Sequence, residues 1–212
     1  MKIIPQDQAP SRLFFTSDTH FGHENILLPT HSDRPFRSVE EQDEVMLERW
    51  NATVGPTDTI WHLGDVAWFR PGNRERLTDL ITNLNGNIRC LVGNHDVHRL
   101  WPQEVIDRME FIEERALLRI KGHGKLVDGD RQELMIHIDH YPLRSWDRKA
   151  HGGLHFHGHV HGRYDRNADP GTIDVGVDSM NFRPVSLERL LVALDVDAYW
   201  ARFRVPRGDT SS

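Results

Sequence analysis

The chain has 212 residues, of which 38% are hydrophobic and 27% charged, a composition that excludes a disordered or fibrous protein and predicts one domain over residues 1–212. Its net charge of -6, from 26 basic and 32 acidic residues, disfavours a long nucleic-acid duplex as partner. A cytoplasmic protein without a membrane partner is expected, because Cys90 is the single cysteine, the first ten residues lack the apolar core of a secretory signal, and no apolar run approaches membrane-spanning length.

Three predicted strands in the first half of the chain each run into a polar string. They span residues 12–17, 59–63 and 87–92. Helical patterns lie between them, and this alternation builds a largely parallel sheet with right-handed crossovers. In open α/β sheets, ligands bind outside the carboxyl ends of the strands, so we expect the polar strings to meet at one edge.

Two helices are predicted between these strands. The first opens with Ser38 and has Glu41 three residues later, which is the signature of a capping box, and it ends near Gly55. The second begins near Asn73 and repeats apolar residues at the spacing of a helix packed on a sheet, namely Leu77, Leu80, Ile81 and Leu84. We interpret these leucines as core.

The second half of the chain changes to strands. After a short helix over residues 101–108, strands are predicted at 116–120, 133–138, 154–158 and 172–177. Consecutive strands without intervening helices indicate a second sheet. The chain from Ser186 is expected to form a helix, then a last strand over 199–205 and a disordered tail after Arg207.

Five short strings of metal-binding residue types occur in a fixed order along the chain. They are Asp18-Thr19-His20, Gly64-Asp65, Gly93-Asn94-His95-Asp96, His140, and Gly158-His159-Val160-His161. Each string alone is weak, because such pairs also arise on solvated loops. The ordered set is a strong indication of a metal centre.

This order resembles that of the calcineurin-like metallophosphoesterase superfamily, and the layout is similar to small bacterial and phage-type phosphoesterases. The resemblance covers roughly residues 13–165. It implies a four-layer α/β/β/α sandwich of two mixed sheets flanked by helices, with the metals at the strand ends. The strand pattern read from the sequence agrees with that expectation.

The resemblance also implies which residues hold two divalent metal ions. Asp65 would bridge both ions through its carboxylate. The first ion would have Asp18, His20 and His161, and the second Asn94, His140 and His159. Carboxylates, imidazoles and an amide without a thiolate suit Mn, Fe, Co, Ni or Zn, and we expect Mn to serve best in vitro.

The chemistry implied is in-line attack on phosphorus by a metal-bridging hydroxide. His95 would lie just outside the metals and protonate the leaving oxygen, with Asp96 orienting it or supporting the site. One departure from the family concerns His95: the phosphoprotein phosphatase branch continues its Gly-Asp string with an Asp that pairs with this histidine, whereas here Val66 and Ala67 follow. That counts against a Ser/Thr protein phosphatase.

Substrate contacts are less well defined by the sequence. His23 and Asn25 follow the first string closely enough to reach the same rim. Trp68 and Phe69 could stack a base or anchor a loop. Four arginines lie on segments that could reach a phosphate, although a solvated surface role is favoured for each: Arg34, Arg70, Arg99 and Arg144.

The remaining histidines and Cys90 are interpreted as structural. Cys90 lies within an apolar strand, where a thiol is inert. Solvated loop positions are expected for His31, His123 and His151. Buried core or supporting positions are expected for His62, His137, His155 and His157.

The sequence thus predicts a phosphoesterase acting on phosphodiesters in a small substrate, with nucleotide derivatives as one candidate class. A phosphomonoesterase or nucleotide pyrophosphatase is the alternative within enzymes. A catalytically idle metal-binding scaffold is the alternative outside them, and the complete ligand set argues against it. The sequence leaves the oligomeric state open.

Overall fold

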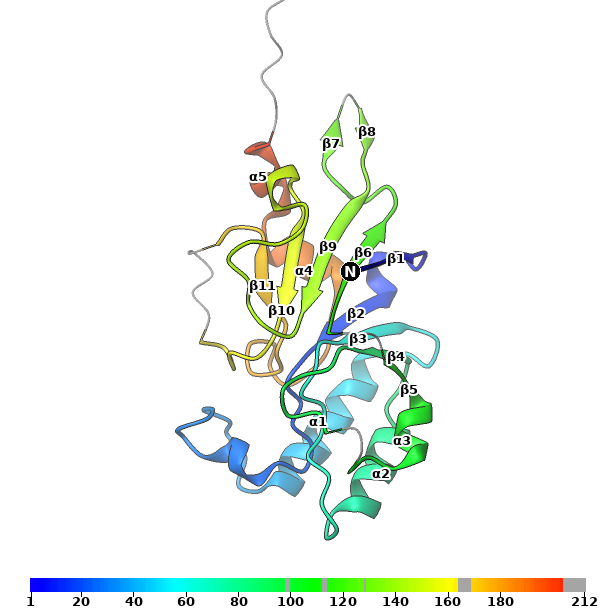
Figure 1. The fold of residues 1–212 in the computed structure, drawn as a ribbon, viewed down its shortest axis with the longest axis vertical. Helices are drawn as coiled ribbons and strands as arrows, with labels where there is room; N and C mark the ends of the chain where they lie inside the picture. Colours follow the sequence, from blue (N-terminus) through cyan, green and yellow to red (C-terminus); the bar gives the residue numbers. More distant parts are fainter. Residues whose placement is uncertain (98–99, 112–113, 128, 164–168, 204–212) are drawn as a thin grey trace, which may run out of the picture.

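Two five-stranded mixed sheets form the centre of the molecule (Figure 1). The computed structural model describes residues 1–97, 100–111, 114–127, 129–163 and 169–203. Within these residues the predicted α/β architecture of two mixed sheets flanked by helices is confirmed.

The sheet that carries the first three ligand strings is parallel apart from one edge strand. Its order is β12 (Val185–Ser186), β2 (Leu13–Thr16), β3 (Thr59–His62), β4 (Asn87–Cys90) and β5 (Met109–Phe111). Only β12 runs antiparallel, beside β2. Because β2, β3 and β4 are parallel neighbours, their carboxyl ends lie side by side.

The other sheet brings the last ligand strings. Its order is β1 (Lys2–Gln6), β6 (Arg115–Ile120), β9 (Leu134–Asp139), β10 (Leu154–His157) and β11 (Thr172–Asp174). Strands β9, β10 and β11 are parallel to one another, and β6 is antiparallel to β9. A small hairpin of β7 (Leu126–Val127) and β8 (Asp130–Arg131) projects beyond this sheet.

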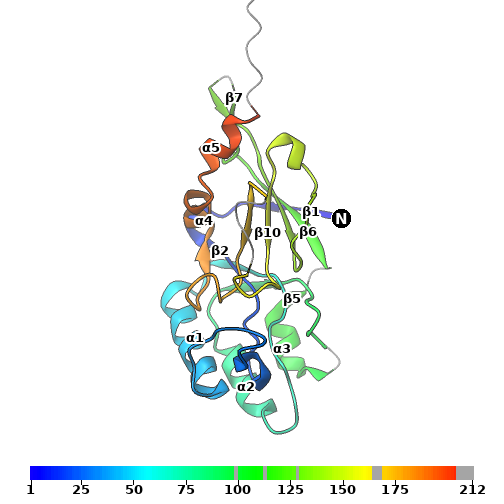
Figure 2. The ribbon, with the colours of Figure 1, turned by 90° about the vertical axis from the view of Figure 1, so that its left-hand side faces the viewer.

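Helices lie beside both sheets, as Figures 1 and 2 show. The first sheet is covered by α1 (Val39–Thr53), α2 (Arg74–Thr82) and α3 (Gln103–Arg108), and two further helices follow β12, α4 (Leu187–Ala193) and α5 (Val196–Ala201). Short 3-10 turns are η1 (Pro10–Arg12), η2 (Glu24–Leu27) and η4 (Lys149–His151). Among the described residues, no helix has the length and apolar character needed to cross a bilayer.

Two apolar clusters hold these layers together. The cluster between the sheets includes Phe15, Trp61 and Phe156, and side chains of α4 and α5 belong to it. The cluster between the first sheet and its helices includes Trp50 and Ile88. Each face of the first sheet is therefore buried, which explains why its strands consist of almost continuous apolar runs.

The predicted helix starts are observed. Ser38 is the N-cap of α1 and accepts a hydrogen bond from the Glu41 amide at 3.2 Å. Asn73 precedes α2, and the apolar face predicted for that helix is buried, at Leu77, Leu80, Ile81 and Leu84.

Two predictions about the chain ends were incomplete or wrong. Strand β1 was not anticipated. Of the last strand expected over 199–205, residues 199–201 are instead the end of helix α5, residues 202–203 form a turn, and the rest lies outside the described residues. The helix is favoured because it lets the Trp200 indole donate to the Gly152 carbonyl at 2.9 Å while Tyr199 enters the core. The predicted disordered tail after Arg207 lies outside the described residues.

Candidate metal centre

The ligand strings of both sheets meet at one rim because backbone hydrogen bonds link the loops that carry them. The Asp18 amide donates to the Gly64 carbonyl, and the His20 amide to the Asp65 carbonyl, each at 3.0 Å. In the other sheet, the Gly158 amide donates to the His140 carbonyl, also at 3.0 Å. The strings therefore lie side by side before any ion is considered.

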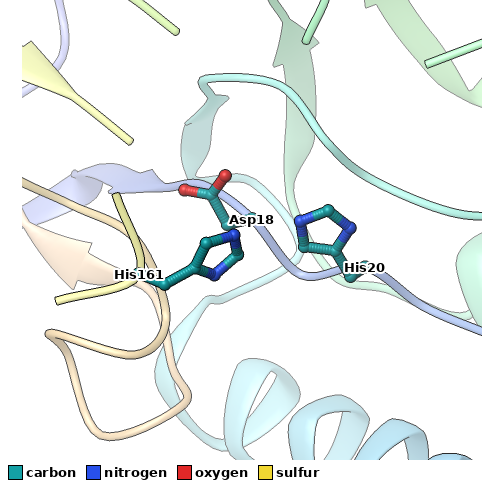
Figure 3. A group of neighbouring side chains, drawn as sticks. All are labelled: Asp18, His20 and His161. Atoms are coloured by element: carbon teal, nitrogen blue, oxygen red, sulfur yellow. The ribbon is translucent and has the colours of Figure 1, made fainter. Parts of the chain in front are cut away.

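A first group consists of Asp18, His20 and His161, whose side chains turn towards one another in Figure 3. Their potential ligand atoms all lie within 4.8 Å of one another. Asp18 and His20 are buried, yet Asp18 Oδ1 and His20 Nε2 have no hydrogen-bond partner among the described residues. Buried polar atoms left unpaired are costly, and a shared cation would satisfy both.

A second group consists of Asp65, His140 and His159, again with ligand atoms within 4.8 Å of one another. Asn94 belongs beside it, because its Oδ1 lies 2.9 Å from His140 Nε2. Asp65 Oδ2 is 3.4 Å from His140 Nε2 and 3.5 Å from His20 Nε2. One carboxylate oxygen thus lies between the two groups, which is the position that a bridging ligand requires.

The backbone at the ligands is strained. Five of the seven predicted ligands have positive φ in the left-handed region, namely Asp18 (58°), His20 (49°), Asp65 (57°), His159 (72°) and His161 (48°). Such a conformation costs a non-glycine residue on the order of 1–3 kcal/mol and concentrates at functional sites. The strain therefore supports a functional interpretation independently of the residue types.

Two glycines in the strings are required by close approach. A Cβ on Gly158 would lie 2.3 Å from Asp18 Oδ2, and one on Gly93 would lie 2.3 Å from Asp65 Oδ1. Any larger residue at either position would displace a predicted ligand carboxylate. The glycines of these strings are thus part of the site geometry and do more than form turns.

The site perturbs its ionisable groups strongly. Burial raises the pKa of Asp18 to about 7, against the opposing effect of His140 and His161. Burial holds the pKa of His20 well below its usual range. For His140, burial alone would lower the pKa, but the facing carboxylates of Asp65 and Asp18 raise it to about 9. Cations would replace the protons that these carboxylates otherwise attract.

His95 lies beside the first group, and its role outside the metals stays a prediction. Its ring centroid is 5.2 Å from that of His20 and 5.4 Å from that of His23, and the side chain is partly exposed. Asp96 has a different set of partners: its carboxylate accepts the amides of Asp65, Val66 and Gly93 at 2.8–2.9 Å. Its observed contacts therefore brace the ligand loops, and a role in orienting His95 stays a prediction.

The two predicted substrate residues differ in placement. His23 reaches the rim, where its Nδ1 is 3.3 Å from His20 Nδ1 and its ring stacks on Trp68 at 5.0 Å between centroids. Burial lowers the pKa of His23 to about 4. Asn25 is exposed in η2, and no described contact brings its side chain to the ligands. Phe69 is buried and serves as an anchor.

The expectation of a surface role was wrong for one of the four arginines. Arg34 is buried, with its guanidinium inside the site wall. Arg70 and Arg144 are exposed as expected, and Arg70 pairs with Glu24. Arg99 lies outside the described residues.

The structural interpretation of the other residues is largely confirmed. Cys90 is buried, and burial raises its pKa well above the usual range. His31 and His151 are exposed and His123 is half-buried. The four histidines expected in the interior are buried, namely His62, His137, His155 and His157.

Sequence reasoning missed two residues at this rim. Tyr141 packs its ring against His159 at 4.5 Å between centroids, and its hydroxyl lies 3.5 Å from Asn94 Oδ1. Its position directly after His140 was a usable signal. Asp178 lies 3.0 Å from His161 Nδ1 through its Oδ2, and no motif marks it in the sequence.

The chain is similar along most of its length to proteins without an assigned activity. It is 27% identical over 189 residues to an uncharacterised protein of Methanocaldococcus jannaschii, covering 87% of this chain and 92% of that protein. The gene 66 protein of Mycobacterium phage D29 is 28% identical over 186 residues, covering 80% of this chain and 89% of the phage protein. None of the protein-family models compared with the chain matches it.

One solved structure and one partial sequence match are also similar to the chain. A protein of unknown function from Aquifex aeolicus shares the fold, with a TM-score of 0.62, 24% identity, and coverage of 86% of this chain and 98% of that one. The symmetrical bis(5'-nucleosyl)-tetraphosphatase of Pseudomonas fluorescens is 31% identical over 83 residues, which is 39% of this chain and 29% of that protein. The partial match supports a distant relationship to metallophosphoesterases.

Proposed function

We propose that the protein is a phosphoesterase that uses two divalent transition-metal ions and acts on phosphodiester bonds. One observation carries the proposal: Asp65 Oδ2 lies within 3.5 Å of both His20 Nε2, in the first ligand group, and His140 Nε2, in the second. An arrangement in which one carboxylate serves two metal positions is typical of dinuclear hydrolytic sites.

In this proposal the bound ions supply an activated water and positive charge for the phosphoryl oxygens, as two-metal sites do at phosphorus. The residues of the chain do the rest. His95, at the partly exposed edge of the first group, donates a proton to the leaving oxygen. The Tyr141 hydroxyl, 3.5 Å from Asn94 Oδ1, is a second group that would donate to a phosphoryl oxygen.

The substrate class is a small diester, and a second candidate has its own support. The partial similarity to symmetrical bis(5'-nucleosyl)-tetraphosphatase favours a phosphoanhydride of a nucleotide as the alternative. Trp68, 39% exposed and stacked on His23 at the rim, offers an aromatic surface for a base in either case. A monoester remains the third possibility.

The test is hydrolysis of bis(p-nitrophenyl) phosphate, p-nitrophenyl phosphate and diadenosine tetraphosphate by metal-stripped protein to which Mn²⁺ is returned. We expect diester turnover that requires Mn²⁺ and falls by about 10²- to 10⁴-fold in His95→Gln, the range that a general acid contributes. His95→Gln should still bind two ions per chain, measured by elemental analysis after gel filtration, because His95 is outside both ligand groups.

Other outcomes decide between the alternatives. Faster hydrolysis of diadenosine tetraphosphate than of the diester would make phosphoanhydrides the preferred substrate class. If two ions bind but no ester is hydrolysed with Mn²⁺, Co²⁺, Ni²⁺ or Zn²⁺, the idle scaffold is favoured. If no ion binds, the metal centre itself is refuted.

A further inference from the structure

The first ligand group has a buried support that no motif in the sequence announces. Asp178 follows the end of β11 by four residues and its side chain is 8% exposed, while the Arg34 side chain is fully buried. The two side chains form a two-pronged ion pair, with Arg34 Nε 2.9 Å from Asp178 Oδ1 and Arg34 Nη2 2.8 Å from Oδ2. Burial without compensation would make either charge costly, so the pair must form together.

The same pair reaches two of the three ligands of the first group. Asp178 Oδ2 lies 3.0 Å from His161 Nδ1, and a carboxylate there can only accept, so Nδ1 carries the proton. His161 Nε2 is then left unprotonated and available to an ion. On the other side, Arg34 Nη2 donates to the main-chain carbonyl of Asp18, and Nη1 donates to that of Thr19 at 3.1 Å.

Arg34 therefore connects segments that belong to different parts of the fold. Besides the Asp18 and Thr19 carbonyls within the first ligand string, the guanidinium binds α1, where Nη1 donates to Gln42 Oε1 at 3.0 Å. The segment that carries Asp178 is joined to β2 as well, because the Val177 amide donates to the Ser17 carbonyl at 3.0 Å. The guanidinium thus fixes the spacing between Asp18, from the first sheet, and His161, from the second.

We propose that Arg34 and Asp178 are positioning residues of the first metal group: Asp178 holds His161 in the tautomer and orientation that bind an ion, and Arg34 holds Asp178 and the Asp18–Thr19 backbone in register. Neither residue is a ligand or touches substrate. This inference rests on the metal centre of the proposed function, but it does not depend on which ester the protein cleaves.

The test isolates the first group. In a His159→Ala background, which lacks a ligand of the second group, titration of metal-stripped protein with Mn²⁺ reports the first group alone. Adding Asp178→Asn or Asp178→Ala should weaken that single binding event by about 10- to 100-fold, the usual effect of removing a partner of a ligating histidine. Asp178→Asn is nearly isosteric, so it guards against a loss of fold, which circular dichroism checks. Its neutral amide can donate as well as accept and therefore no longer enforces the proton on His161 Nδ1.

A variant that lacks a ligand of the first group, instead of the second, provides the specificity control. In His161→Ala, where only the second group is complete, Asp178→Asn should leave Mn²⁺ affinity unchanged within about twofold. A comparison pair elsewhere is Asp43 with Arg76, 2.8 Å apart, in which the Asp43 side chain is buried and that of Arg76 is 36% exposed; Asp43→Asn should change neither affinity. In the otherwise native chain, Arg34→Lys should act as Asp178→Asn does, since lysine lacks the two-pronged geometry.

The outcomes separate this inference from the proposed function. Unchanged first-group affinity in Asp178→Asn and Asp178→Ala overturns the positioning role, even if the enzyme hydrolyses diesters. An equal loss in both backgrounds also overturns it, because it would show a general structural defect. Selective loss at the first group supports it, even if no ester tested is cleaved.

Discussion

At the scale of single residues, the sequence indicated the candidate metal ligands but not the residues that hold those ligands in position. Asp18, Asp65 and His140 stand in strings whose residue types announce metal binding, and the structure brings them together. Asp178 and Arg34 carry no such pattern, because their bond joins positions 144 residues apart. Burial of Arg34 could not be foreseen either, since a lone arginine is mostly exposed unless a partner compensates its charge.

His62 provides a residue-scale prediction about pH. Its ring is fully buried, its Nε2 lies 2.9 Å from Thr19 Oγ1, and its Nδ1 lies 3.2 Å from the Gly64 amide. Thr19 Oγ1 donates to the Val66 carbonyl, so the His62 nitrogen beside it is the donor and Nδ1 must accept. Burial accordingly lowers the pKa of His62 from 6.5 to about 3.

The unfolded chain binds a proton at His62 below about pH 6.5, and the folded chain does not until about pH 3. The contribution of neutral His62 to the free energy of unfolding is therefore fully present above about pH 6.5. Between about pH 6.5 and pH 3 it is lost, by about 1.4 kcal/mol for each unit by which the pH falls. Urea unfolding of metal-free protein should show a shallower pH dependence in His62→Gln than in the native chain. The exposed-histidine variant His151→Gln should keep the native slope; identical slopes in all three proteins would contradict the assignment.

At the scale of elements, periodicity and capping signals predicted most helices and strands, and the misses have physical causes. Strand β1 was missed because Pro5 interrupts it and Ile3 is exposed, which leaves no clear apolar alternation. Helix α5 was expected as a strand because a short aromatic segment fits either state, and packing of Tyr199 and Trp200 decides between them. Short elements are set by tertiary contacts more than by local pattern.

The start of α1 gives the prediction at this scale. The Ser38 hydroxyl accepts the Glu41 amide, and the Glu41 carboxylate accepts the Arg37 amide at 2.7 Å. Ser38→Ala should lower the free energy of unfolding by about 1 kcal/mol, the usual effect of losing such a cap. Urea denaturation measures this loss, and Ser38→Asp, which restores an acceptor, should recover most of it. The activity proposed for the protein should stay unchanged per folded molecule, because the bonds of Ser38 and Glu41 are to the start of α1 itself and to Arg37.

At the scale of the whole molecule, the two sheets share one site, and this was predictable only in part. The sequence indicated two sheets and a common rim from strands that end in ligand strings. It could not indicate that the loop after β9 would cover the outward face of the second sheet, where Trp146 stacks on His155 at 5.3 Å between centroids. That contact depends on a loop path that no periodic pattern encodes.

Comparing the thermal stability of metal-free and metal-loaded protein tests whether ions bind where the loops of the two sheets meet. Each ion present at 100 times its Kd adds about 2.7 kcal/mol of stability, and for a chain of this size 1 kcal/mol corresponds to about 2–4 °C in Tm. Returning Mn²⁺ to the metal-free protein should thus raise Tm by roughly 10 °C or more. The increase should largely vanish in Asp65→Asn, whose side chain faces both groups; an equal increase in that variant would place the ions elsewhere.

The hydrogen bond from the His159 amide to Asp18 Oδ2, at 2.9 Å, closes a span of 141 residues. On a ribosome, the N-terminal part of this span is made long before its partner emerges, so neither proposed metal position can be complete until His159 and His161 have left the exit tunnel. In the proposed metal centre, ion binding therefore follows the folding of the first sheet and does not start it. A visible absorption band from Co²⁺ in the first group would report the final docking of the two sheets and no earlier stage.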